Sequence, residues 1–202
     1  MGKIITIGRE FGSGGRELGR RLADELGIAY YDSEILTEIA KDTEYSHAYI
    51  EELSQGRPVP LFPIHYGNSW SPANDPHFKN AIDVFSAQRK VLHELATKSD
   101  CIIIGRCADY ILEEYKPLRI FVYASMESKL LRCRERSKED EHLSDREMIK
   151  RIKRIDKKRR QYYEFYTGRK WGAKENYDLM VNTSDKDIKK LAAAIITMFA
   201  HK

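Results

Sequence analysis

The feature that most constrains the fold is an apolar strand that leads directly into a glycine-rich turn and then a helix. Residues 4–7 are apolar or β-branched and carry no charge, which is typical of a strand buried on both faces. Glycines crowd residues 8–15, and Leu18, Leu22 and Leu26 then recur at helical spacing. Glycine lets successive backbone N–H groups converge, and a helix N-terminus adds a partial positive charge. The stretch therefore predicts a phosphate-binding site.

The loop departs from the standard phosphate-binding pattern, which ends in Gly-Lys-Ser/Thr. When residues 12–14 are aligned with its glycine core, Gly15 takes the place of the lysine and Glu17 lies near the hydroxyl position. A shift by one residue brings Arg16 to the lysine position, so Arg16 is the candidate to replace the lysine electrostatically. The alternative is a tight strand-to-helix turn that binds nothing. We expect six residues to bind phosphate: Gly12, Ser13, Gly14, Gly15, Arg16 and Glu17.

Composition limits the class of protein. The chain has 202 residues, of which 42% are hydrophobic and 33% charged, as expected for one globular domain with a substantial core. No apolar run is long enough to cross a membrane, and the chain begins with a core strand, so we expect no signal peptide and a cytoplasmic location. Three irregularly spaced cysteines fit neither a disulfide framework nor a zinc site. We expect Cys101, Cys107 and Cys133 to be reduced and mostly buried.

Positive charge is concentrated in one segment. Residues 132–174 contain 16 Lys/Arg against 8 Asp/Glu, or +8, whereas the whole chain carries +4. This concentration indicates a polyanionic ligand near the segment. Aromatic residues do not interleave there as a base-stacking platform would require, which argues against nucleic acid. The phosphates of a nucleotide account for the charge more simply. The sequence does not indicate an oligomeric state.

Short apolar strands alternate with helices along the chain, which predicts a three-layer α/β/α fold around a doubly wound, parallel, five-stranded sheet. The expected strands are residues 4–7, 28–31, 101–104, 118–124 and 179–181. The expected helices are residues 16–26, 33–41, 46–53, 78–98, 107–114, 125–137, 144–166 and 186–200. Five prolines make residues 57–76 a long irregular loop. We expect 1–202 to form a single domain.

Local signals predict several helix ends and one buried stripe. The expected caps are Gly27, Ser33, Ser125, a capping box from Ser144 to Glu147, and Ser184 or Asp185. The buried stripe of the helix over 78–98 is expected to be Ile82, Phe85, Val91, Leu92 and Leu95. Three strands end in polar groups, namely the glycine loop, Asp32 and Gly105-Arg106. Because ligands bind beyond the carboxyl ends of parallel strands, we expect these groups to meet in one cleft.

Seven segments, spread nearly end to end along the chain, carry a family resemblance: GREFGSGGREL, YYDSEIL, IIIGRCADYIL, LRIFVYAS, LLRCRER, RIDKKRRQYYEFYTGRKW and YDLMVNT. Through them the chain resembles the cytidylate-kinase-like branch of the P-loop nucleoside monophosphate kinases. The resemblance implies a lid at about 137–171 and an acceptor-side helical insertion at about 44–98. It also implies transfer of the γ-phosphoryl group of ATP, with Mg²⁺, to an acceptor phosphate.

Several arginines and one aspartate are candidate site residues. Arg106 resembles the family's glycine-arginine step that contacts the acceptor phosphate; a structural ion pair is the alternative. Asp32 could orient an acceptor hydroxyl or hold a magnesium-bound water, or it could cap the next helix. The candidates for catalysis are Arg16, Asp32, Arg106, Arg154 and Arg159, and those for nucleotide binding beyond the loop are Arg134 and Arg136. For the basic helix residues, the alternative is a solvated face. We assign no residue as a metal ligand.

The acceptor-side motif differs from that of true cytidylate kinases, which have a threonine and then a tyrosine-arginine pair after the aspartate. Here Asp32 is followed by Ser33-Glu34-Ile35-Leu36, and residues 33–41 contain no arginine. We therefore expect cytidylate to be a poor acceptor. The main interpretation is an ATP-dependent kinase of a nucleoside monophosphate or a similar small acceptor. The alternatives are a catalytically weak nucleotide-binding or regulatory protein and a kinase of a small non-nucleotide metabolite.

Overall fold

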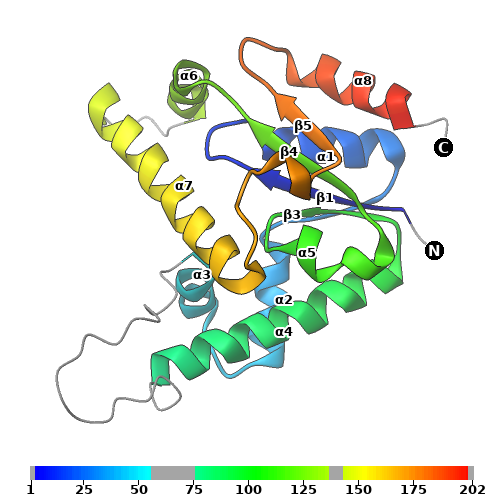
Figure 1. Ribbon diagram of the computed structural model, residues 1–202, viewed down its shortest axis with the longest axis vertical. Coiled ribbons are helices and arrows are strands. Elements are labelled where there is room, and N and C mark those ends of the chain that lie inside the picture. The colour runs from blue at the N-terminus through cyan, green and yellow to red at the C-terminus, as the bar shows by residue number, and fades with distance from the viewer. Residues whose placement is uncertain (1–2, 56–75, 137–142, 200–202) are drawn as a thin grey trace.

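A computed structural model describes residues 3–55, 76–136 and 143–199. Its centre is a five-stranded parallel sheet with the strand order β2-β3-β1-β4-β5 (Figure 1). The strands are β1 Ile4–Arg9, β2 Ala29–Tyr31, β3 Cys101–Ile104, β4 Leu118–Tyr123 and β5 Leu179–Asn182. The helices are α1 Gly15–Leu26, α2 Glu34–Asp42, α3 His47–Gln55, α4 Pro76–Lys98, α5 Ala108–Ile111, α6 Met126–Arg136, α7 Asp145–Thr167 and α8 Ile188–Phe199. Two short 3-10 turns, η2 Glu113–Tyr115 and η3 Lys174–Asn176, complete the described elements.

The first strand lies in the middle of the sheet, as its uncharged sequence predicts. Ile5 is in register with Ile102 of β3 on one side and with Leu118 of β4 on the other. Because all pairings are parallel, the carboxyl ends of the strands meet at one edge of the sheet. The predicted doubly wound, five-stranded α/β/α fold is confirmed.

Each face of the sheet has its own hydrophobic core. On one face, α1 and α8 cover Ile5 and Ile7 of the first strand (Figure 1). On the other face, α2, α4 and α5 pack over Ile4, and the carboxyl-terminal part of α7 contributes Tyr162 and Tyr163. The remainder of α7 extends past the sheet edge beside α6 (Figure 1). Helical layers therefore pack against both faces of the sheet and position the strand ends.

Three of the predicted helix ends are confirmed. Gly27 ends α1 in the left-handed conformation, with a φ angle of 65°. The Ser125 hydroxyl accepts a hydrogen bond from the Ser128 N–H at 3.2 Å. Ser144 and Glu147 form the reciprocal capping box at the start of α7.

Two other predicted caps are wrong. Ser33 already has helical backbone angles, and its side chain makes no capping hydrogen bond; the Glu34 carboxylate instead accepts from the Asp32 N–H at 3.0 Å. At α8, neither Ser184 nor Asp185 caps the helix, because it begins later than expected. Asp187 Oδ1 accepts from the Lys189 N–H at 2.7 Å and is the cap.

The buried stripe of α4 is confirmed in part. Val91 and Leu92 are buried, but Ile82 is 43% exposed because Val84, at 1% exposure, fills the core position in that turn. Within the described residues the cysteines are free, with Cys101 and Cys107 buried. The predicted irregular loop at 57–76 lies outside the described residues, apart from its last residue, which begins α4. No described helix has the length and hydrophobicity of a membrane span.

Candidate active site

The loop between β1 and α1 is a cradle of backbone N–H groups. Gly12 and Gly14 have φ angles of 74° and 80°, in the left-handed region that favours glycine. Gly14 is the N-cap of α1, and no side chain in the described part of the chain caps this helix, so its first N–H groups are available to a ligand. A Cβ atom at Gly14 would lie 2.9 Å from Ile188 Cδ1, which leaves little space for a side chain. This geometry suits an anion.

Neighbouring segments hold the loop in place from outside. Asp156, in α7, accepts a hydrogen bond from the Phe11 N–H at 2.7 Å. The Thr183 hydroxyl donates to the Ser13 carbonyl at 2.6 Å, and the Ser13 hydroxyl donates to the Glu10 carbonyl at 2.8 Å. The Ser13 hydroxyl, predicted to bind phosphate, therefore serves the loop itself in this structure. A loop anchored at these points is preorganised for a ligand.

A buried lysine beneath the loop is fully paired. Lys129 is 4% exposed, and its Nζ lies 2.7 Å from Glu10 Oε2 and 3.1 Å from Asp156 Oδ2. A Cβ atom at Gly12 would lie 3.1 Å from the Lys129 carbonyl, so α6 packs directly against the loop. Two carboxylates neutralise this ammonium group. Lys129 therefore ties the loop to α6 and α7 and has no charge to spare for a phosphate.

Four arginines gather around one carboxylate at the carboxyl ends of the strands. Arg16 Nε lies 2.6 Å from Asp32 Oδ2, and Arg9 Nη2 lies 3.5 Å from Asp32 Oδ1. Arg159, from α7, donates to the Arg9 carbonyl at 3.3 Å. The Arg106 guanidinium makes no hydrogen bond or ion pair with another described residue, and its charge interacts with Asp32 at longer range. We call Arg9, Arg16, Arg106 and Arg159 the arginine cluster.

Burial disfavours the positive charge of three members of the arginine cluster. Burial lowers the pKa of Arg9 well below its ordinary value, and the neighbouring charge of Arg159 lowers it further. Burial likewise lowers the pKa of Arg106, and it lowers the pKa of Arg159 to about 10. Positive groups that are buried together without a matching number of carboxylates destabilise one another. A bound anion would supply the missing charge.

The Arg106 backbone is held in an unusual conformation. Gly105, Arg106 and Cys107 have φ angles of 68°, 60° and 54°, so two non-glycine residues follow one another in the left-handed region. Gln88 donates to the Arg106 carbonyl at 2.9 Å, and the Tyr162 hydroxyl donates to Gln88 Oε1 at 3.2 Å. Such strain persists where the surroundings impose it, and it is concentrated at functional sites.

The arginine cluster stands between two neighbouring cavities. The larger, of about 230 Å³, runs along the glycine loop and is also lined by Arg132, Arg136 and Arg151. The smaller, of about 70 Å³, is lined by the Gly105-Arg106 step and by aromatic side chains of α7 and the segment after it. Arg9, Arg16 and Arg159 line both cavities. A group that passes from one cavity to the other meets these three charges.

The other predicted site residues differ in how close they lie to the loop and the two cavities. Glu17, at the start of α1, is paired with Arg136 at 2.5 Å, so Arg136 lies beside the loop as the nucleotide-binding prediction requires. Arg134 is paired with Asp145 on the outer side of α6. Arg154 is exposed and lines neither cavity. Of the predicted catalytic residues, the structure thus brings together Arg16, Asp32, Arg106 and Arg159.

Sequence reasoning missed Arg9, Lys129 and Asp156. A signal existed for Arg9, because the standard pattern opens with a glycine five residues before its second glycine, and residue 9 fills that position when Gly14 is the second. Lys129 and Asp156 gave no local signal. Their contacts with the loop span more than a hundred residues of chain, and nothing in either helix sequence marks them.

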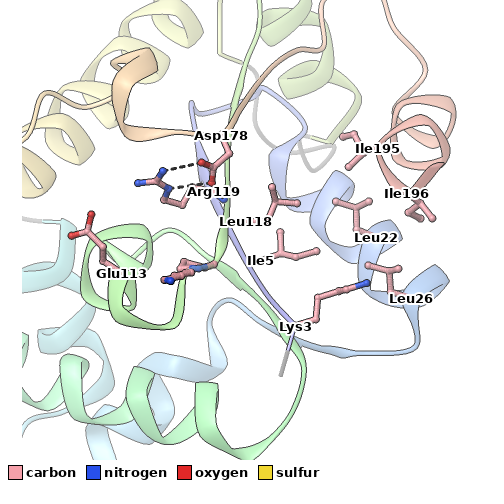
Figure 2. A pocket seen from close by; sticks show the side chains of 12 residues that line it. Lys3, Ile5, Leu22, Leu26, Glu113, Leu118, Arg119, Asp178, Ile195 and Ile196 are labelled. Atoms are coloured by element: carbon pink, nitrogen blue, oxygen red, sulfur yellow. Dashed lines mark hydrogen bonds and ion pairs between the residues drawn. The ribbon is translucent and has the colours of Figure 1, made fainter. Parts of the chain in front are cut away.

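A larger cavity lies at the opposite end of the sheet. It measures about 660 Å³ and opens between the first residues of β1 and β4 and the helices α1 and α8 (Figure 2). Apolar side chains such as Ile5, Leu22 and Leu118 line it, and its polar rim includes an ion pair between Arg119 and Asp178 at 2.8 Å. Ligands of parallel α/β folds bind at the other end. We therefore place the candidate active site at the glycine loop.

Solved structures share this architecture. A shikimate kinase from Bacteroides thetaiotaomicron matches with a TM-score of 0.57 and 15% identity over 98% of both chains. A shikimate kinase from Acinetobacter baumannii, in complex with shikimate, matches with a TM-score of 0.54 and 18% identity over 100% of this chain and 94% of that one. The fold and the glycine loop together define a P-loop kinase fold.

The family follows from the sequence match. The chain belongs to the cytidylate kinase-like family, whose model matches residues 4–185. An uncharacterized protein from Eubacterium ventriosum has a similar structure, with a TM-score of 0.72 and 26% identity over 99% of each chain. No curated protein matches the chain. The predicted resemblance is confirmed.

Proposed function

We propose that the protein transfers the γ-phosphoryl group of ATP to a small acceptor that carries a phosphate or another anionic group, with a nucleoside monophosphate as the first candidate. ATP would place its phosphates along the glycine loop, and the acceptor would place its anionic group in the smaller cavity. One observation carries the proposal. Arg9, Arg16 and Arg159 line both cavities, and among the described residues Asp32 is the one carboxylate that forms an ion pair with any of these three.

Phosphoryl transfer needs positioning and positive charge more than covalent help from the protein. The three shared arginines would neutralise the oxygens of the phosphoryl group as it passes between the cavities. Arg106 would hold the anionic group of the acceptor. An acceptor phosphate is ionised at neutral pH and needs no general base, so Asp32 has a positioning role: it orients Arg9 and Arg16. For a hydroxyl acceptor, Asp32 is the carboxylate that could take the proton.

Mg²⁺ is part of the proposal, as a companion of ATP. Kinases hold Mg²⁺ through one or two carboxylates together with the phosphates of the substrate. Among the described residues no three His, Cys, Asp or Glu side chains gather as a metal site. Asp32 and Glu17 lie beside the loop, but arginines pair with both. We therefore assign the metal mainly to the phosphates, with a bound water on Asp32.

Other parts of the proposal concern the chain as a whole. We propose one domain over 1–202, in which about 137–171 closes as a lid and about 44–98 forms the acceptor side. A cytoplasmic location accompanies this function. Arg159 connects the lid to the site, because it comes from α7 and lines both cavities.

The acceptor prediction changes in one respect. The expectation of poor cytidylate turnover rested on the absence of arginine from residues 33–41. In the proposed arrangement, Arg9, Arg16 and Arg159 line the same small cavity as Arg106 and would bind the acceptor phosphate together with it. The arginine missing from α2 is thus offset for phosphate binding. Weak cytidylate turnover stays a prediction that depends on how the base is held.

A coupled ADP-release assay tests the proposed function. The panel contains CMP, dCMP, UMP and AMP, with small alcohols and sugars as neutral acceptors. We expect a phosphorylated acceptor to stimulate ADP release well above the acceptor-free rate. Turnover of neutral acceptors alone would favour a kinase of a non-nucleotide metabolite and contradict the anionic acceptor.

A second candidate is a catalytically weak nucleotide-binding protein. The observation in its favour is Gly15, which stands where the loop lysine is expected. Calorimetric titration with ATP separates the two candidates when it is combined with the same panel. Tight ATP binding without turnover of any acceptor would favour the regulatory protein.

A further inference from the structure

In the glycine loop, the positive side chain stands at a different position from the lysine of the standard phosphate-binding pattern. In the standard pattern a glycine opens the loop, and a second glycine five residues later is followed directly by the lysine. With Gly14 as the second glycine, Arg9 takes the place of the first and Gly15 takes the place of the lysine. The chain carries its charge where the pattern has glycine, and glycine where the pattern has charge.

The two positions share one space. A Cβ atom at Gly15 would lie 2.6 Å from Arg9 Cβ and 3.2 Å from Arg9 Cγ. Carbon atoms pack at about 3.5–4.0 Å, and the Arg9 Cβ atom is fixed by the backbone of β1. A lysine at residue 15 is therefore excluded while residue 9 has a side chain. Arg9 and Gly15 therefore replace the glycine and the lysine of the standard pattern together, as a pair.

The Arg9 guanidinium ends between the two cavities with donors to spare. Its side chain is 12% exposed, and its one ion pair within the described residues is the 3.5 Å contact with Asp32. Arg9 Nε is buried and has no hydrogen-bond partner in the described part of the chain. A Cβ atom at Gly105 would overlap Arg9 Nη1, so residue 105 must be glycine for the guanidinium to reach this place. A guanidinium has five N–H donors, and few of them are used here.

Lys129 and Arg16, the cations closest in sequence or packing to the loop, fit this role less well. Lys129 is neutralised by Glu10 and Asp156. Arg16 pairs with Asp32 at 2.6 Å, and its side chain is 61% exposed, so water competes for its donors. Arg9 combines burial with a weak partner. In a water-poor setting, its charge acts more strongly on a nearby phosphate.

We propose that Arg9 does the work of the missing loop lysine, so that its guanidinium contacts the terminal phosphates of ATP and the phosphoryl group in transfer. The inference rests on the proposed function and makes Arg9 a catalytic residue. Arg16, besides lining both cavities, holds Asp32 in place and through it Arg9.

Arg9→Gln tests the charge and keeps the stem that packs against Gly15. Loss of one preorganised charge donor typically lowers kcat by about 100-fold to 1,000-fold, and we expect that range here. We also expect ATP affinity to fall tenfold or more by calorimetry. Arg9→Lys should stay within about tenfold of the natural protein. Arg16→Ala is the matched control and should lower kcat by about tenfold.

The double variant Arg9→Gly/Gly15→Lys tests the exchange itself. It restores the first glycine and the lysine of the standard pattern, so it should recover at least tenfold in ATP affinity over Arg9→Gly. Gly15→Lys alone should lose ATP binding, because its Cβ atom has no space. Circular dichroism and thermal melting identify the variants that fold.

Two results would overturn the inference. One is a folded Arg9→Gln variant whose ATP affinity and kcat stay within threefold of the natural protein. The other is a folded double variant that binds ATP no better than Arg9→Gly. If the natural protein turns over no acceptor on the panel, the proposed function fails, whereas ATP calorimetry of the same variants still decides the role of Arg9.

Discussion

Arginines at the two ends of the sheet are held in opposite ways. At the amino end, Arg119 donates two hydrogen bonds to Asp178, at 2.8 Å and 3.1 Å, and this bonding raises the pKa of Arg119. At the carboxyl end, burial lowers the pKa values of Arg9, Arg106 and Arg159, and the one ion pair that these three form within the described residues is the 3.5 Å contact of Arg9 with Asp32. A cation that supports the fold has its own carboxylate. Cations left short of carboxylates inside the fold indicate a ligand that brings the charge.

The largest expected effect comes from closing the cradle at the carboxyl end. Gly14→Val places a branched side chain at a φ angle of 80°, beside Ile188, where a phosphate must approach the backbone. We expect ATP binding to fall by more than 100-fold in calorimetry. Gly27→Val is the control, because residue 27 also has a positive φ angle but a Cβ atom there would have no neighbour within 4 Å. Equal ATP affinity in the two variants would contradict the phosphate-loop assignment.

The next effect separates the two kinds of arginine by affinity. Arg106→Gln should weaken binding of the acceptor by about tenfold to 100-fold, since one charge-assisted contact contributes about 1.5–3 kcal/mol. Arg119→Gln should leave acceptor binding unchanged, because Arg119 faces Asp178 at the other end of the sheet. The measurement is the acceptor KM, or Kd by calorimetry. Similar losses in the two variants would mean that Arg106 is not specific to the acceptor.

A smaller effect is expected on the free energy of unfolding, where Arg159→Gln and Arg119→Gln should act in opposite directions. Arg159→Gln removes a buried positive charge from the arginine cluster, so the ligand-free protein should gain about 1 kcal/mol of unfolding free energy. Arg119→Gln breaks a partly exposed ion pair and should lose up to about 1 kcal/mol. Urea denaturation of both variants without ligand gives the values. A loss of stability in Arg159→Gln would show that the cluster serves the fold.

The smallest effect concerns motion of α7. ATP should slow hydrogen exchange in α7, because Asp156 and Arg159 both contact the loop region. High salt should weaken this protection, since charge drives the closure. Amides of α8, at the other side of the sheet, provide the internal reference. Identical exchange with and without ATP would indicate a static basic helix.

Local patterns were sufficient for the fold. Uncharged apolar runs predicted the strands, because a strand buried on both faces tolerates little else. The meeting of Asp32, Gly105-Arg106 and the glycine loop followed from parallel topology alone. The predictions of helix caps were less accurate where several candidate residues lay close together in the sequence. At α8, Asp187 formed the capping bonds, and Ser184 and Asp185 lay too early in the chain.

The details of the site depended on contacts that the sequence does not show. Arg159 was a candidate through family resemblance, and nothing local separates it from Arg154 on the same basic helix. The structure separates them by burial, because Arg159 faces the loop and Arg154 faces solvent. Lys129 and Asp156 act across a distance in sequence that no periodic pattern spans. Arg9 was missed because the standard pattern predicts a cation at residue 15 or 16. It predicts none at residue 9, whose side chain occupies the space beside Gly15.

The contact between Arg9 and Gly15 also restricts how this loop can change over generations. A mutation that introduced lysine at residue 15 first would produce a steric clash, since the new Cβ atom would lie 2.6 Å from Arg9 Cβ. The reverse order removes the shortest contacts, because glycine at residue 9 has no side chain; the 3.3 Å contact with Val122 Cβ is then the closest that remains. The standard and the present arrangement of such a loop are thus joined by a path whose two steps must come in a fixed order. A library that randomises residues 9 and 15 separately would miss the functional combinations in which both residues change.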